Sequence, residues 1–201
     1  MRLQKYIDNQ QFMNTVNWEK LKKILDKDCQ QYIHELKNAK YLLLRGVKGS
    51  NIPLFIETKK IRKNRKPRLI MKDLHDRLGK DSKKIYGWNI RKEGLFTTKS
   101  REDASVWGKP VIIFPIGSFK YVWSDDVLDL YDAYDHWDFV LDNDKDYENE
   151  ILPELKKYHT NNLNKYLRTP IVLTSECIIN GNKYYAINYI WYETLLKYYA
   201  G

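Results

Sequence analysis

Two apolar segments that flank an Asn-Gly-Asn turn near the carboxy terminus constrain the fold most strongly. Residues 171–179 and 183–189 are rich in β-branched and aromatic side chains, and residues 180–182 lie between them with a glycine at the centre. Short turns of this composition join neighbouring antiparallel strands. The sequence therefore predicts a β-hairpin close to this end of the chain.

The first strand of this hairpin carries one carboxylate among apolar side chains. Because side chains alternate between the two faces of a strand, Glu176 shares a face with Val172, Thr174 and Ile178. A charge placed in such surroundings is costly unless a partner satisfies it. We therefore expect Glu176 to have a specific partner.

The rest of the chain alternates between segments typical of helices and of strands. Residues 17–39 repeat apolar side chains at three- and four-residue steps, which predicts one packing helix. Short strands are expected at residues 41–46, 95–98, 110–116 and 119–123. Further helices are expected at residues 69–78 with Gly79 as a cap, after Ser100, from Ser124 to Tyr134, and at 149–167 with Pro153 in the first turn.

These elements predict one α+β domain, in which residues 1–40 form a helical N-terminal extension and residues 41 to about 190 form the core. Hydrophobic residues make up 43% and charged residues 30% of the 201, as in ordinary globular proteins. No apolar run approaches the length of a membrane span, and the first residues lack a secretory signal, so a cytoplasmic location without membrane contact is expected. The two cysteines are too few for a disulfide scaffold, and the four histidines lack zinc-ligand spacing, so no metal site is expected.

Basic side chains are concentrated in one short block. Residues 59–68 contain seven basic residues and no acid. Such a block either is a solvated loop or attracts the phosphates of a nucleic acid. The candidate nucleic-acid-binding residues are Lys59, Lys60, Arg62, Lys63, Arg65, Lys66 and Arg68.

Common nucleotide-binding and hydrolase motifs are missing from the chain. Residues 46–50 lack the spacing of a phosphate-binding P-loop, no GxGxxG follows a strand, and no serine nucleophile elbow is present. The remaining candidates are Arg45 at the end of an early strand, a threonine pair in a middle strand, and Glu176 in the late hairpin.

The order of these residues resembles the R-S-E class of mono-ADP-ribosyltransferases, including related bacteriophage proteins. The resemblance covers about residues 41–190 and is carried by segments 42–46, 88–98, 104–108, 112–117 and 175–178, followed by Tyr184 and Tyr185. It implies split, mainly antiparallel β-sheets with flanking helices and a cleft for NAD⁺, the co-substrate. It also implies an enzyme that passes ADP-ribose from NAD⁺ to a macromolecule.

The resemblance assigns roles to particular residues. Arg45, with Gly46 beside it, matches the first-strand arginine that contacts the phosphate or ribose of NAD⁺, and a guanidinium fork suits a diphosphate. Thr97 or Thr98 matches the hydroxyl of the middle strand, and Glu176 matches the catalytic glutamate that binds the ribose 2′-hydroxyl. Phe96 either stacks on the nicotinamide or fills the core. Arg45 could instead form a salt bridge, and the threonines could serve only the strand.

The chain departs from the family pattern at two places. Thr174 stands where protein-modifying relatives often have Gln or Glu, and Phe-Thr-Thr replaces Ser-Thr-Ser in the middle strand. The basic block offers a track for phosphates and favours RNA or DNA over protein as the acceptor, and Thr174 is compatible with that preference. The alternatives are a non-catalytic nucleic-acid-binding module and an NAD⁺ glycohydrolase. A toxin or phage-conflict role, with an antitoxin or inhibitor protein as a partner, follows from the resemblance alone.

Overall fold

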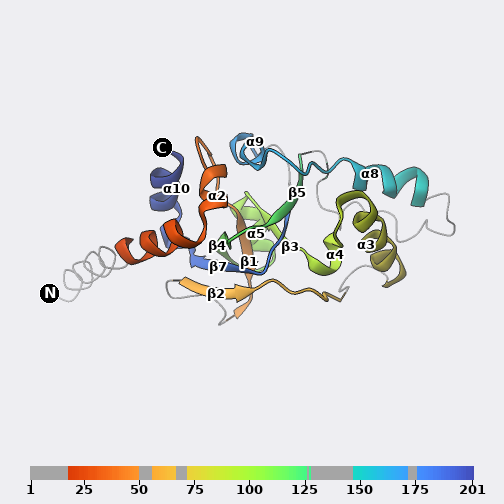
Figure 1. Cartoon of the computed structure of the whole chain (residues 1–201), viewed down its shortest axis with the longest axis horizontal. Helices are drawn as coiled ribbons and strands as arrows, with labels where there is room; N and C mark the ends of the chain where they lie inside the picture. The colour runs from red at the N-terminus through yellow and green to blue at the C-terminus, as the bar shows by residue number, and fades with distance from the viewer. Residues whose placement is uncertain (1–17, 50–55, 67–71, 126, 128–146, 172–175) are drawn as a thin grey trace.

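Seven antiparallel strands form one sheet in the computed structural model, which describes residues 18–49, 56–66, 72–125, 127, 147–171 and 176–201. The strand order is β2-β7-β4-β1-β3-β6-β5 (Figure 1). The predicted α+β class is therefore confirmed. The strands are β1 (Leu44–Val47), β2 (Ile56–Lys60), β3 (Leu95–Thr98), β4 (Lys109–Ile116), β5 (Lys120–Ser124), β6 (Glu176–Asn180) and β7 (Lys183–Asn188).

Helices lie at both ends of the sheet. In Figure 1, α3, α4 and α8 gather at one end and α2 and α10 at the other. A helix over residues 18–28 precedes α2. The other helical elements are α2 (Gln30–Glu35), α3 (Lys72–Tyr86), α4 (Ile90–Glu93), α5 (Arg101–Val106), the π-helix η2 (Tyr147–Ile151), α8 (Leu152–Lys156), α9 (Leu163–Arg168), the 3-10 helix η3 (Tyr189–Trp191) and α10 (Tyr192–Ala200). Within the described ranges, no helix has the length and apolar character required to cross a membrane.

The sheet narrows sharply between β1 and β3. β3 pairs with β6 at four successive positions, and β1 pairs with β4 at four, but β1 and β3 share one registered pair, Leu44 with Thr98. The sheet therefore consists of a four-stranded set, β2-β7-β4-β1, and a three-stranded set, β3-β6-β5. Thr98, the polar residue of β3 at the junction with β1, is therefore the last residue of its strand.

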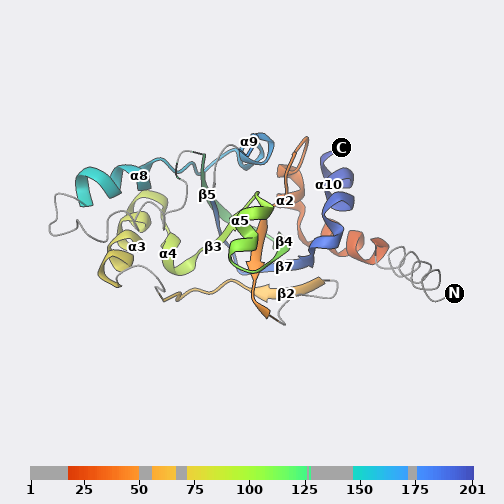
Figure 2. The same ribbon diagram turned by 180° about the vertical axis from the view of Figure 1, so that it is seen from behind.

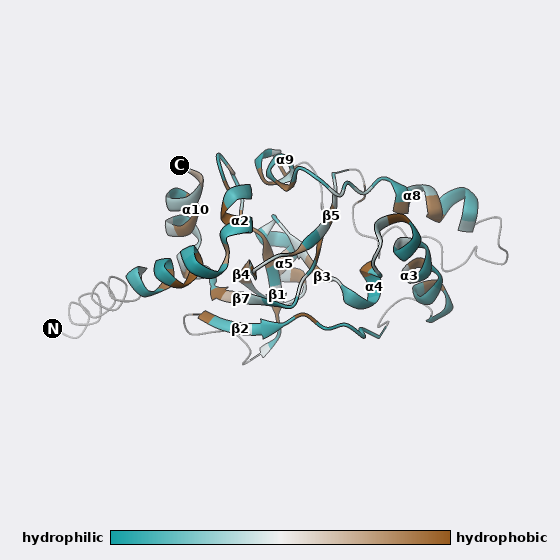
Figure 3. Cartoon of the chain, viewed as in Figure 1, coloured by the Kyte–Doolittle hydropathy of each residue, from teal (hydrophilic) through white to brown (hydrophobic). Residues whose placement is uncertain are grey.

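Two hydrophobic clusters hold the elements together. The larger joins the N-terminal helical residues Leu21, Leu25 and Tyr32 to strand residues such as Leu44 and Phe114. The smaller packs α3, η2 and α8 against the three-stranded set through Leu78, Ile151, Leu155, Val122 and Ile178. Hydrophobic residues, drawn in brown, alternate with hydrophilic ones along the ribbons of α3 and α8 (Figure 3). The N-terminal helical segment thus shares a core with the strands.

Buried tyrosines fix the approach to β1. The amide of Leu43 donates to the Tyr32 hydroxyl at 3.0 Å, and the amide of Leu42 donates to the Tyr192 hydroxyl at 3.2 Å. Backbone amides buried before a strand need such acceptors. Two aromatic side chains therefore position the residues that lead to Arg45 while filling the core.

Several predicted elements are confirmed. The hairpin turns at residues 180–182 between β6 and β7, as predicted, and β1, β3, β4 and β5 match the other predicted strands within a few residues. Ser100 begins α5 as predicted, with its side-chain oxygen accepting from the amide of Asp103. β2 was not among the predicted strands, and it contains the first two residues of the basic block. The helix predicted from Ser124 lies mostly outside the described residues, as do residues 172–175 of the predicted hairpin strand.

Two helix predictions are wrong in their extent. Gly79 does not end α3, which continues to Tyr86; a Cβ at Gly79 would lie 2.4 Å from the Asn89 side chain, so close packing explains this glycine. Gly87, with a φ of +77°, follows the true end. The helix predicted over residues 149–167 is broken between α8 and α9, because His159 pairs with Trp123 of β5 instead.

Candidate active site

Arg45 bridges the narrow junction between the two strand sets. The half-buried side chain leaves β1, and its Nη1 donates to the backbone oxygen of Phe96 in β3 at 2.6 Å. Arg65 Nη1 donates to the oxygen of Gly94, two residues earlier, at 3.2 Å. Alternate carbonyls of a strand point to the same edge. Two guanidiniums therefore line the edge of β3 that faces β1.

A row of three polar side chains crosses the three-stranded set. Glu176 of β6 is paired with Thr98 of β3 on one side and with Ser124 of β5 on the other. Directly opposed residues in antiparallel strands project from the same face. Thr97 projects from the opposite face, where its hydroxyl donates to the backbone oxygen of Cys177 at 2.7 Å. Of the two threonines, Thr98 is the one beside Glu176.

Glu176 is buried and has a tyrosine partner. The side chain is 8% exposed, and its Oε1 accepts a hydrogen bond from the Tyr158 hydroxyl at 2.9 Å. Tyr158 lies between α8 and α9, where the next residue, His159, exchanges two backbone hydrogen bonds with Trp123 of β5 at 2.8 and 3.0 Å. The bridge fixes the backbone beside Tyr158 against β5, and the hydroxyl constrains the direction of the carboxylate.

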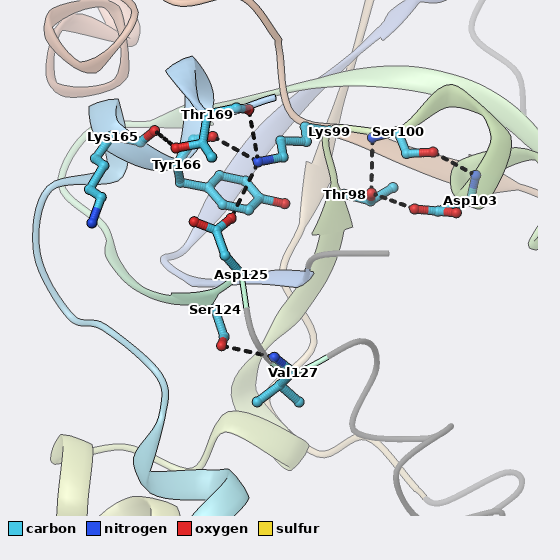
Figure 4. A network of polar contacts seen from close by, with 10 residues as sticks. All are labelled: Thr98, Lys99, Ser100, Asp103, Ser124, Asp125, Val127, Lys165, Tyr166 and Thr169. Carbon is cyan, nitrogen blue, oxygen red and sulfur yellow. Dashed lines mark hydrogen bonds and ion pairs between the residues drawn. The ribbon is translucent and has the colours of Figure 1, made fainter. Parts of the chain in front are cut away.

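The Thr98 hydroxyl takes part in the start of α5. It accepts from the amide of Ser100 at 3.0 Å and donates to Asp103 Oδ2 at 3.3 Å, while Ser100 Oγ accepts from the amide of Asp103 at 3.1 Å (Figure 4). These contacts satisfy the amides at the beginning of a helix. Thr98 is thus held in one orientation by the helix that follows β3.

Lys99 anchors the end of β3 from the other side. Its ammonium group is buried, donates to the backbone oxygens of Tyr166 and Thr169 at 3.1 Å each, and lies 3.4 Å from Asp125 (Figure 4). Burial lowers the pKa of Lys99, while the neighbouring Asp125 opposes that shift. The contacts connect β3 to α9 and to the segment after β5, so Lys99 supports the strand ends that carry Thr98 and Ser124.

Gly46 has a clear packing role. A Cβ at this position would lie 2.1 Å from the backbone oxygen of Ala104 and 2.8 Å from the amide of Gly108. Seen from behind, α5 lies over β1 (Figure 2). The glycine therefore allows α5 to approach β1 next to Arg45. Its expected contact with the dinucleotide stays a prediction.

The basic block divides into two parts. Lys59 and Lys60 lie on β2, at the outer edge of the sheet, where Lys59 pairs with Glu57 at 2.6 Å. Arg62, Lys63 and Lys66 follow on an exposed segment that runs towards α4 in Figure 1. Arg65 instead turns inwards and lies over the ring of Phe96. Arg68 lies outside the described residues.

Tyr158, Ser124 and Lys99 belong to this site but were not found from the sequence. Ser124 was predicted to begin a helix after a strand at residues 119–123, whereas it is the last residue of β5, and the register of β5 against β6 shows that it opposes Glu176. Tyr158 falls where one continuous helix was predicted, which hid its contact with the sheet. A lysine in a run of polar residues after a strand gave no sign of burial.

Two hollows in the described part of the chain are lined by residues other than Glu176. One, of about 290 Å³, is next to the β6–β7 turn and includes Lys63 and Asn180. Another of similar volume lies between α3 and η2 and includes Arg77 and Glu148. Across the described ranges, no group of three or more His, Cys, Asp or Glu side chains is arranged to hold a metal ion. Cys29 and Cys177 are both buried free thiols.

Comparison with known proteins finds no matching family model, no matching curated protein and no matching solved structure.

Proposed function

We propose that the protein is a mono-ADP-ribosyltransferase with an ADP-ribosyltransferase-like fold that uses NAD⁺ as its co-substrate. The observation that carries the proposal is the placement of an arginine, a threonine hydroxyl and a buried glutamate on β1, β3 and β6, which are neighbours in the sheet. Arg45 is hydrogen-bonded to β3, and Thr98 opposes Glu176. The division of the strands into sets of four and three also agrees with a split sheet.

The reaction assigns a distinct role to each group. The bond between the nicotinamide nitrogen and the ribose breaks, and its electron pair leaves with nicotinamide. The ribose carbon acquires positive charge, and the negative charge of the Glu176 carboxylate stabilises it. The same carboxylate accepts a hydrogen bond from the ribose 2′-hydroxyl. A nucleophile of the acceptor then bonds to that carbon and loses its proton to solvent. Arg45 holds the dinucleotide phosphate during these steps.

A nucleic acid is the acceptor that the basic block favours. Lys60, Arg62, Lys63 and Lys66 are exposed on one continuous segment. Such a track attracts phosphates through counterion release, so acceptor use should weaken steeply with salt. The same segment would serve a nucleic-acid-binding module without transfer activity, which is the second candidate function. A toxin or phage-conflict role, and an inhibitor protein as a partner, would suit the transfer activity.

The experiment follows the ADP-ribose group of NAD⁺ labelled in the adenylate. Wild-type protein and Glu176→Gln are incubated with RNA, with DNA and with protein, and label is measured in each polymer and as free ADP-ribose. The proposal predicts label in nuclease-sensitive material that Glu176→Gln abolishes. Free ADP-ribose alone indicates a glycohydrolase, and label only in protease-sensitive material rejects the nucleic-acid acceptor. Salt-sensitive RNA or DNA binding without NAD⁺ affinity would select the non-catalytic module.

A further inference from the structure

Phe96 lies at the meeting point of three arginines from separate parts of the chain. Arg45 of β1 donates to its backbone oxygen. The guanidinium carbons of Arg65 and of Arg91 lie 4.5 and 5.1 Å from the centre of its ring. The three side chains come from β1, from the segment after β2 and from α4. Three fixed positive charges gathered around one residue form a strongly electropositive site.

The backbone holds these arginines in place. The amide of Arg65 donates to the oxygen of Lys92 at 3.1 Å, which fastens the basic segment to α4. Asn89 caps α4 by accepting from the amides of Arg91 and Lys92, so the short helix has a defined start. The Nε of Arg91 is buried and has no hydrogen-bond partner within the described ranges. A buried donor of this kind marks a place where an acceptor belongs.

Two carboxylates of the neighbouring helices α3 and α4 contact other groups. Asp76 lies 2.9 Å from the ammonium of Lys92, and Glu93 accepts a hydrogen bond from the Asn180 side chain at 3.3 Å. Phe96 and Thr98 are two residues apart in β3 and so project from one face, the face that carries Glu176. The Phe96 ring, over which Arg65 and Arg91 lie, is therefore on the same face of the sheet as Glu176.

We propose that Arg65 and Arg91, together with Arg45, form a binding subsite for the diphosphate of a dinucleotide, with the Phe96 ring as its platform. The identity of the ligand as NAD⁺ rests on the proposed function. Planar guanidiniums can each bind a phosphate through two parallel hydrogen bonds, which suits a group with two linked phosphates. Arg65 thereby belongs to the dinucleotide site, whereas Lys60 and Lys66 of the same basic block stay on the acceptor track.

The test measures binding of inorganic pyrophosphate by calorimetry at fixed salt. Arg65→Gln and Arg91→Gln are compared with the wild type, and Arg168→Gln, which removes an exposed arginine at the end of α9, is the matched control. Loss of a charge-assisted, bidentate contact predicts pyrophosphate binding weaker by about tenfold or more in each arginine variant. The control should change by less than about twofold, since exposed charges act weakly at moderate salt. Arg65→Lys should recover only part of the affinity, and urea unfolding confirms that each variant is folded.

The outcomes separate this subsite from the transfer reaction. Wild type that does not bind pyrophosphate, or Arg65 and Arg91 variants that bind it as Arg168→Gln does, would overturn the subsite. Variants that lose single-stranded RNA affinity but keep pyrophosphate affinity would place Arg65 on the acceptor track and also overturn it. Pyrophosphate binding that depends on both arginines supports the subsite even if nicotinamide is never released, and in that case only the proposed function fails.

Discussion

Replacing Tyr158 with phenylalanine removes one hydroxyl that contacts the buried carboxylate of Glu176. The two side chains are 5% and 8% exposed, and the oxygens are 2.9 Å apart, so water does not readily replace the lost contact. A hydrogen bond to a charged group contributes about 1.5–3 kcal/mol. If that interaction orients Glu176 for the reaction, the same energy corresponds to a turnover reduced by roughly 10- to 150-fold.

The assay is steady-state nicotinamide release, with urea unfolding of the same preparations. We expect Tyr158→Phe to lower kcat while the KM for NAD⁺ changes by less than about twofold, because the hydroxyl acts through its hydrogen bond to Glu176. Tyr189→Phe, a partly buried tyrosine on η3, is the control. In a Glu176→Gln background the Tyr158 substitution should have little further effect on turnover. A stability loss with unchanged kcat, or an equal loss of kcat in both backgrounds, would refute a positioning role.

Three other substitutions test separate features. Gly46→Ala should lower the free energy of unfolding by about 1–3 kcal/mol in urea, because its Cβ would overlap the backbone oxygen of Ala104; unchanged stability would contradict the close approach of α5. Burial and the charge of Arg91 lower the pKa of His75, so the unfolded chain binds the proton first and stability should fall as pH drops below 6.5. Urea unfolding at pH 7.5 and pH 5 should show a smaller pH effect in His75→Gln, and an equal effect would exclude His75 as its source. The last substitution replaces the exposed basic residues with glutamate; they are Lys60, Arg62, Lys63 and Lys66. The free energy of unfolding should fall by about 0.5 kcal/mol or less per site, and the salt dependence of acceptor use should become flatter. Initial transfer rates equal to wild type at low and moderate salt would show that these residues do not capture the acceptor.

The elements that the sequence predicted well are those specified locally. The Asn-Gly-Asn turn and its flanking strands depend on neighbouring residues, and the hairpin appears where expected. The Ser100 cap likewise depends on residues only a few positions away. The prediction that Gly79 ends a helix was wrong because glycine also permits close packing. Here it allows the Asn89 side chain to approach the helix backbone.

The site was predicted only in part, because its assembly depends on register between distant strands. Alternation placed Glu176 on one face of a strand, but only pairing shows that Thr98, and not Thr97, lies beside it. The contact from Tyr158 depends on a bridge between residues 123 and 159 that breaks an otherwise helical pattern. In the sequence, Arg65 could not be distinguished from the six other basic residues of the block. In the structure, its guanidinium lies over the ring of Phe96.

The rate of nicotinamide release from NAD⁺, compared between wild type and Glu176→Gln, tests the central claim most directly. Glutamine keeps the shape of the side chain but removes the charge that would oppose the developing positive ribose, so turnover should fall by about 100-fold or more with the fold intact. Glu193→Gln on α10 is the matched control and should keep the wild-type rate. Equal rates in wild type and Glu176→Gln, or no release by the wild type with any acceptor, would contradict the account.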